Sequence, residues 1–314
     1  MIPKSTIDAE ILYNKPLVSS MSLRVPRKHS GDEAIYGNYF LMNLVLSKPS
    51  IIKQIVPGQF ILLQLPKVQA DTQGILLRRP FTIFSAVPPK RDGGNASKKG
   101  GYYNTIEIMY QVVGKGTKLM SSLKPGTKLN ILGPLGNGFT INRNADVSIL
   151  VAGGIGIAGL YMLLTRMSLR VPKGRSNLNR SEIYLFIGAK TKKDLCLLPV
   201  LRRLTPNIIA STEDGSYGVK GLITTALEKF LHKLITHNSE LIISLYVCGP
   251  AGMSQAVRKI ALKYKIPAQL SLEARMACGL GLCRVCVCKT TEGWSTVCQD
   301  GPVFPAEAIP NGIL

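Results

Sequence analysis

Residues 147–165 read VSILVAGGIGIAGLYMLLT and carry no charged side chain. Uncharged runs of about 18 or more residues are candidates for a membrane span. This run begins with a β-type pattern and then places four glycines between Gly153 and Gly159. That composition is typical of a buried strand, a tight turn and a helix. We therefore predict a strand–turn–helix unit here rather than a transmembrane segment.

The turn of this unit carries Gly154-x-Gly156-x-x-Gly159. Between a strand and a helix, such glycines let a phosphate approach the positive N-terminus of the helix. The acidic residue that the usual dinucleotide fingerprint places after the next strand is missing, because residues 187–195 read IGAKTKKDL. The sequence therefore predicts a different kind of nucleotide-binding α/β domain. Three lysines of this segment either meet a phosphate or form a solvated turn: Lys190, Lys192 and Lys193.

The organisation of the chain follows from the patterns around this unit. Strand-like and helix-like runs alternate through residues 147–266, which indicates a parallel α/β sheet. Residues 35–146 instead show short β-type runs separated by turn signals, as in an antiparallel barrel or sandwich. Residues 267–314 hold five of the seven cysteines. We predict a multidomain α+β chain with parts 1–146, 147–266 and 267–314, the first beginning with an N-terminal extension of about 30 residues.

The charge pattern limits the classes of partner. The formal net charge is +21, but it is spread over residues 1–266, and no basic stripe with interleaved aromatic residues occurs. This argues against nucleic acid and for an ordinary solvated surface. Two basic segments, 88–103 and 170–181, have the composition of surface loops. The N-terminus lacks the apolar run of a secretory signal, so we expect a reducing, cytoplasmic compartment.

Two motifs of the first part are suited to binding an anion. Arg79-Pro80-Phe81-Thr82 can present a guanidinium fork to a pyrophosphate, with a further hydrogen bond from Thr82. The alternative for this motif is a plain surface turn. Gly114-Lys115-Gly116-Thr117 offers successive backbone N–H groups that can converge on an anion.

The cysteines of the last part read Cys278-x4-Cys283-x2-Cys286, followed eleven residues later by Cys298. This order is the plant-type [2Fe–2S] spacing, in which one loop supplies three thiolates and a distant cysteine closes the site. A structural zinc site is the alternative, but zinc sites usually pair two C-x2-C knuckles and only one is present. We favour the iron–sulfur interpretation.

The fourth ligand is either Cys288 or Cys298. We favour Cys298, because two residues of strand cannot easily return from Cys286 to the same iron. Cys196 and Cys248 are not expected to be ligands. Disulfides are disfavoured, since a chain of 314 residues can build its own core and the expected compartment is reducing.

In this order, RPFT, GGIG (153–156) and CGPAGM (248–253) resemble the ferredoxin–NADP reductase superfamily. Three longer stretches narrow the resemblance to electron-transfer subunits of NAD-dependent (class 1B) dihydroorotate dehydrogenases: VVGKGTKLMSSLKPGTKLNILGPLGNGF (112–139), SLEARMACGLGLCRVCVCKT (271–290) and VCQDGPVF (297–304). The resemblance implies a flavin-binding β-barrel over 1–146, an NAD-binding α/β domain over 147–266 and a [2Fe–2S] module over 267–314.

The resemblance also implies a set of site residues. Those for FAD are Arg79, Pro80, Phe81, Thr82, Met109, Tyr110, Gln111, Gly116 and Thr117. Those for NAD are Gly153, Gly154, Gly156, Asp214, Cys248, Gly249, Pro250 and Met253. Those for the cluster are Cys278, Cys283, Cys286 and Cys298. Family members often carry Arg where this chain has Gln111.

The implied function is that of a cytoplasmic oxidoreductase subunit in pyrimidine (UMP) biosynthesis. A partner subunit with FMN oxidises dihydroorotate, and electrons pass through the cluster and FAD to NAD⁺ in a heterotetramer of two catalytic and two electron-transfer subunits. One alternative is a reductase subunit of a sulfide dehydrogenase, a hydrogenase or a bifurcating transhydrogenase. The other, from a different class, is a cluster-based redox sensor. The sequence leaves the choice between NAD and NADP open, because the lysines near residue 190 suit a 2′-phosphate.

Overall fold

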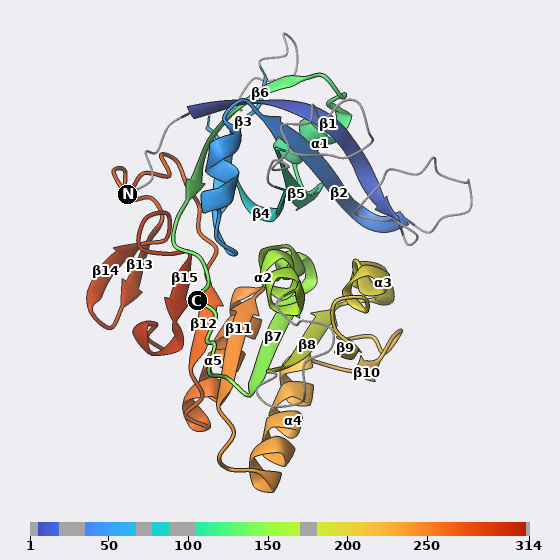
Figure 1. Ribbon diagram of the computed structural model, residues 1–314, viewed down its shortest axis with the longest axis vertical. Coiled ribbons are helices and arrows are strands. Elements are labelled where there is room, and N and C mark those ends of the chain that lie inside the picture. Colours follow the sequence, from blue (N-terminus) through green and yellow to red (C-terminus); the bar gives the residue numbers. More distant parts are fainter. Residues whose placement is uncertain (1–5, 19–34, 67–76, 88–103, 170–180, 312–314) are drawn as a thin grey trace.

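Figure 1 shows the computed structural model of the chain, which describes residues 6–18, 35–66, 77–87, 104–169 and 181–311. A barrel from the N-terminal half lies above a sheet that is flanked by helices, and a small hairpin lies beside both. The basic segments 88–103 and 170–180 lie outside the described residues.

The upper body is a closed barrel of six antiparallel strands in the order β1-β2-β5-β4-β3-β6. The strands are β1 (Thr6–Val18), β2 (Ile35–Leu46), β3 (Phe60–Gln64), β4 (Arg79–Val87), β5 (Thr105–Gln111) and β6 (Lys128–Leu135). A short 3₁₀ helix, Pro49–Gln54, precedes β3, and helix α1, Lys115–Ser122, follows β5. The sequence predicted an antiparallel barrel or sandwich for this part of the chain, and the structure shows a barrel.

Strand β1 corrects the prediction that the first 30 or so residues are an extension. Residues 6–18 pair with β2 on one side and β6 on the other, so they complete the barrel. Ile7, Ala9 and Ile11 are buried among the barrel side chains. The alternation of polar and apolar residues in TIDAEI, residues 6–11, is the period-two signal of a strand with one buried face.

The lower body is a sheet of seven strands in the order β10-β9-β8-β7-β11-β12-β15. Its strands are β7 (Val147–Gly153), β8 (Glu182–Ala189), β9 (Asn207–Thr212), β10 (Val219–Lys220), β11 (Ile243–Cys248), β12 (Ala268–Ser271) and β15 (Val303–Pro305). The helices are α2 (Ile157–Leu169), α3 (Leu198–Leu201), α4 (Ile223–His237) and α5 (Ala251–Lys263). The predicted strand–turn–helix unit is thus β7 and α2, and no helix of the described residues is long and apolar enough to cross a membrane.

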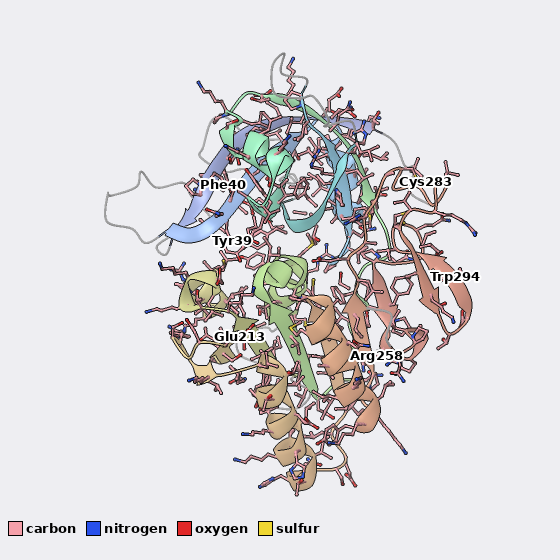
Figure 2. All side chains as sticks on the ribbon, turned by 180° about the vertical axis from the view of Figure 1, so that it is seen from behind. Tyr39, Phe40, Glu213, Arg258, Cys283 and Trp294 are labelled. Carbon is pink, nitrogen blue, oxygen red and sulfur yellow. The ribbon has the colours of Figure 1, made fainter. Side chains whose placement is uncertain are left out.

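The C-terminal part shares this sheet. β12 pairs in parallel with β11, and β15 pairs antiparallel with β12, so the boundary drawn at residue 266 falls inside one sheet. The hairpin of β13 (Val287–Thr290) and β14 (Gly293–Thr296) lies outside it. Arg258 of α5, labelled in Figure 2, is buried and donates hydrogen bonds to the Ala306 carbonyl oxygen at 2.9 Å and to Asn311 Oδ1 at 2.7 Å. These bonds tie the end of the chain to α5.

Helix α2 lies between the two bodies (Figure 1). Its Tyr161 stacks on Phe84 of β4 with 4.1 Å between ring centroids. One cluster of buried side chains combines the outward face of the barrel, including Met109 and Leu41, with both faces of α2. The packing of α2 therefore fixes how the carboxyl ends of the sheet strands face the barrel.

Candidate functional site

A cleft of about 780 Å³ lies where the carboxyl ends of the sheet strands meet the barrel. This is the edge at which open α/β sheets bind their ligands. Predicted site residues from three separate motifs line it together: Gln111, Gly153, Gly154, Gly156, Gly249, Pro250 and Met253. The fold thus brings the glycine turn after β7 and the turn after β11 into one site.

Glycine is required at two positions of the cleft because neighbouring atoms come too close to leave space for a side chain. A Cβ atom on Gly156 would lie 2.1 Å from the carbonyl oxygen of Cys248, a contact that no side chain can make. A Cβ atom on Gly153 would lie 2.6 Å from Pro250 and 2.8 Å from Met253. The floor of the cleft is therefore bare backbone, which lets a phosphate reach the N–H groups at the start of α2.

Gly159 of α2 is approached by one residue of the RPFT motif and one residue of the CGPAGM motif. A Cβ atom on Gly159 would lie 2.7 Å from Cys248 Sγ and 3.8 Å from Thr82 Cγ2. Burial raises the pKa of the Cys248 thiol to about 12, with the negative charge of Glu273 adding to the effect. The thiol is therefore neutral at physiological pH.

Glu273 is a residue at one end of the cleft that sequence reasoning did not single out. It follows β12, lines the cleft and is exposed at its mouth. The cleft walls nevertheless desolvate its carboxylate, which raises its pKa. Its position after the last parallel strand, within the quoted SLEARM, is the signal that points to it.

At the opposite end of the cleft, Glu213 is a lining residue and the predicted Asp214 is not. Asp214 does not line the cleft, because its carboxylate accepts hydrogen bonds from the N–H and the hydroxyl of Ser216 at 3.0 and 2.7 Å. These bonds lower its pKa. Glu213 lines the cleft instead, and so does Lys190. In Figure 2, Glu213 lies on the other side of α2 from Cys283 of the cysteine loop.

The two anion motifs of the barrel also come together. A Cβ atom on Gly116 would lie 2.2 Å from Arg79 Nε, so the guanidinium packs directly on the first turn of α1. Thr117 Oγ1 accepts hydrogen bonds from the N–H groups of Val113 and Gly114 at 2.9 and 3.1 Å. The N–H groups of that first turn have no partner within the helix, so they and Arg79 form one positive site.

The three predicted residues of β5 alternate between the two faces of the strand, with Tyr110 on the inner face and Met109 and Gln111 on the outer face. Tyr110 is buried inside the barrel, where its hydroxyl donates to Asn14 Oδ1 at 2.9 Å, so only its backbone can face a ligand. Met109 packs against the α2 side, and Gln111 lines the cleft. Tyr39 of β2, which the sequence analysis did not name, lines the cleft as well (Figure 2).

The four predicted cluster cysteines form two thiol pairs. The side chain of Cys278 contacts that of Cys283, and the side chain of Cys298 contacts that of Cys286. Backbone N–H groups of the loop also point at sulfur: Leu280 and Cys283 donate to Cys278 Sγ at 3.4 Å, and Gly281 donates to Cys298 Sγ at 3.2 Å. Desolvation opposes ionisation of Cys278, but these donors outweigh it and lower its pKa to about 6.

This arrangement fits a two-iron cluster. Each iron of a [2Fe–2S] cluster takes two cysteine thiolates, which matches two pairs, and N–H groups aimed at sulfur stabilise its negative charge. Within the described residues, no group of three or more His, Cys, Asp and Glu side chains is placed to hold a single metal ion. Cys288 lies on β13 and lines a second cavity together with Trp294 and Glu273.

The barrel, the sheet and the cysteine loop together define a reductase of the ferredoxin–NADP reductase fold that carries an iron–sulfur module. The chain superposes on the NADH-dependent reduced ferredoxin–NADP oxidoreductase of a study on flavin-based electron bifurcation, with a TM-score of 0.70, 24% identity and coverage of 96% of this chain and 89% of that chain. A ferredoxin–NADP⁺ reductase from Neisseria gonorrhoeae gives a TM-score of 0.56 at 15% identity, over 82% and 91% of the two chains.

Sequence comparison is more specific. Residues 273–310 match the family model described as the iron–sulfur cluster binding domain of dihydroorotate dehydrogenase B, and residues 150–259 match the oxidoreductase NAD-binding domain. The electron transfer subunit of dihydroorotate dehydrogenase B (NAD(+)) from Caldanaerobacter subterraneus is 34% identical over 81% of this chain and 86% of its own. The subunit of the same name from Desulforamulus reducens is 30% identical over 82% and 88%.

The chain therefore belongs to the family of electron transfer subunits of NAD-dependent dihydroorotate dehydrogenase B. It is an NAD-linked oxidoreductase subunit with an iron–sulfur module at its C-terminal end.

Proposed function

We propose that the chain carries electrons from a dihydroorotate-oxidising partner, through a [2Fe–2S] cluster and FAD, to NAD⁺ in pyrimidine biosynthesis. The bound flavin supplies the conversion between single-electron and hydride transfer. The observation that carries this proposal is that the side chains of Thr82 and Cys248 both approach Gly159 of α2. A residue of the flavin motif and a residue of the nicotinamide motif thus lie against the same helix, between the barrel and the sheet.

The chain's own residues suit both cofactors. Arg79 and the first turn of α1 provide the positive site that a flavin diphosphate requires. Gly116 has no side chain, which allows the Arg79 guanidinium to pack against its backbone. The glycines of the cleft admit the diphosphate of NAD to the start of α2. Cys278 and Cys283 would hold one iron, and Cys286 and Cys298 the other. In this assignment the flavin part is 1–146, the NAD part 147–266 and the cluster part 267–314.

The surface around the cluster loop supports a protein partner. Four apolar side chains in and beside the loop are exposed: Leu282 by 80%, Val285 by 55%, Val287 by 40% and Trp294 by 69%. We call these four residues the cluster rim. Exposed apolar groups that gather in one place mark interaction sites. Because the rim includes residues of the ligand loop itself, a partner that covers it brings its own redox group close to the cluster. We propose an FMN-containing catalytic subunit in a cytoplasmic heterotetramer of two plus two chains.

The decisive experiment is an anaerobic visible spectrum of the purified chain before and after NADH, with flavin and iron quantified. We expect one FAD and about two irons per chain, with the flavin band bleached by NADH. Steady oxidation of NADH with an artificial acceptor separates an enzyme from a redox sensor. Zinc without flavin would contradict the proposal and return the cysteines to a structural role.

The partner is tested separately by co-purification with an FMN-type dihydroorotate dehydrogenase. Trp294→Ala (Figure 2) should weaken the complex while leaving iron content unchanged, because Trp294 is exposed and is not a ligand. Val219→Ala is the matched control, since Val219 is exposed by 51% on β10, at the far edge of the sheet. Equal assembly of both variants would remove the cluster rim from the interface.

A further inference from the structure

A buried carboxylate lies on the outer face of the barrel, away from the residues that line the nucleotide cleft. Glu107 of β5 is only 5% exposed, and it precedes Met109 by two residues on the same face of that strand. The hydroxyls of Tyr13 and Ser85 both donate to its carboxylate, and the side-chain amide of Asn43 contacts it. Because a charged group is rarely buried without a countercharge, these surroundings decide which form Glu107 takes.

The register of the strands places Glu107 and its partners in one row. Tyr13 of β1 pairs with Asn43 of β2, and Asn43 pairs with Glu107 of β5. Glu107 pairs in turn with Ser85 of β4. Residues that lie directly opposite each other share one face of a sheet, so the row crosses four strands on the outer side of the barrel. The charge of Glu107 therefore affects the contacts of all four strands.

The row contains no positive group that neutralises the carboxylate. Within the described residues, the one cation that acts on Glu107 is Lys15 of β1, whose Nζ lies 4.8 Å from the centre of the Tyr13 ring and forms no ion pair with Glu107. Burial has the largest effect on Glu107 and raises its pKa, whereas the hydrogen bonds and the charge of Lys15 lower the pKa by less. Both hydroxyls can accept a hydrogen bond as well as donate one, so the row can also hold a protonated carboxyl group.

We propose that Glu107 makes the stability of the barrel depend on pH: the four strands hold together while its carboxyl group is protonated, and they open more readily once it is ionised. The ionised carboxylate contacts only neutral donors, so the folded barrel bears a charge that the unfolded chain exposes to water. A group whose folded pKa lies above its unfolded pKa gives stability that is fully present below the unfolded pKa and is lost as pH rises through the folded pKa. Alkaline conditions should therefore loosen the barrel.

Strand β1 connects this row to helix α1. Asn14, the residue after Tyr13, donates to the carbonyl oxygens of Met120 and Leu123 at 2.6 and 3.1 Å, at the C-terminal end of α1. The first turn of α1 is where we propose that the flavin diphosphate binds, so this part of the inference rests on the proposed function. Loosening of β1 should then speed the loss of flavin from the protein.

Infrared spectroscopy of the full chain tests the protonation of Glu107 directly. At a pH where exposed carboxylates are ionised, the wild type should show the carbonyl band of a protonated carboxyl group, and Glu107→Gln should lack that band. Glu10→Gln is the matched control and should keep it, because Glu10 is an exposed carboxylate on the same barrel. Tyr13→Phe removes a donor that favours the charged form, so the band should persist to a higher pH. A wild type without the band overturns the inference.

Hydrogen exchange measures the opening of the strands. After correction for the intrinsic rate, the opening constant of amides in β1, β2, β4 and β5 should rise by up to about tenfold per pH unit above the folded pKa of Glu107, because one proton is released. Glu107→Gln should not show this rise, and an equal rise in both proteins overturns the inference. Flavin loss that accelerates equally in both overturns the link to α1. If the chain holds no flavin, the proposed function fails, and infrared and exchange data still decide the inference.

Discussion

In the loop 278–286, three of the four cluster cysteines lie on one short stretch, whereas the nucleotide cleft takes its lining from several strands. Within the loop, N–H groups of Leu280, Gly281 and Cys283 point at cysteine sulfur. The cleft instead combines the ends of β7, β8, β9 and β11 with residues of barrel strands β2 and β5.

The difference predicts which kind of substitution damages each site. The loop carries most of its donors and ligands on its own backbone, so loss of a ligand is what damages it. The cleft depends on backbones that approach to within van der Waals contact, so one added methyl group is enough to disturb it. Four substitutions test this contrast, in order of decreasing expected effect.

The largest effect is expected from Cys298→Ser, which removes the one predicted ligand that lies outside the loop. The variant should lose its cluster, so that iron falls from about two per chain to near zero and the visible cluster bands disappear. Cys288→Ser is the control, because Cys288 lies outside the two thiol pairs. If Cys288→Ser loses the iron and Cys298→Ser keeps it, the assignment of the fourth ligand is wrong.

The next effect is expected from Gly156→Ala. The added Cβ would lie 2.1 Å from the Cys248 carbonyl oxygen, so the turn must move, at a cost of about 1–3 kcal/mol in the free energy of unfolding. Gly252→Ala is the matched control: no atom lies within 4 Å of its Cβ, and a helical position should gain about 0.5–1 kcal/mol. Urea unfolding measures both, and equal stabilities would show that the cleft floor is not tightly packed.

A smaller effect, dependent on pH, is expected at Glu273. Desolvation raises the pKa of this carboxyl, so it becomes negative at a higher pH than an ordinary glutamate does. The nicotinamide ring of NAD⁺ is positive and that of NADH is neutral. Affinity for NAD⁺ should therefore rise by about threefold as pH increases through the raised pKa, and affinity for NADH should not. Glu273→Gln should abolish the rise in a binding titration; a persistent rise would assign it to another group.

The smallest effect is expected at the turn before α1, which, like the cluster loop, is built from one stretch. Thr117→Ala removes the acceptor for the N–H groups of Val113 and Gly114 and should lower the free energy of unfolding by about 1 kcal/mol. Thr117→Ser keeps the hydroxyl and should restore the stability in thermal unfolding. A loss of equal size in both variants would trace the effect to the methyl group instead.

The features that can be predicted from the amino-acid sequence are those whose signal lies within one segment. The spacing of the cysteines predicts four cluster ligands, and the structure groups these four cysteines into two pairs. The glycine turn after β7 and the alternation of strands and helices predicted the parallel sheet. These signals are local because loop geometry and period-two or period-3.6 patterning act over a few residues.

Which distant residues lie together follows from the packing of the folded chain and not from any one segment. Glu213 replaces Asp214 in the cleft because the register of β9 on β8 turns one carboxylate toward the ligand edge and the other toward Ser216. Strand β1 closes the barrel because it pairs with β2 on one side and with β6 on the other, a pairing that its period-two pattern alone does not specify. Thr82 and Cys248 both approach Gly159 because α2 packs between the barrel and the sheet. Strand pairing and interdomain packing join residues far apart in the chain, so no local pattern in the sequence records them.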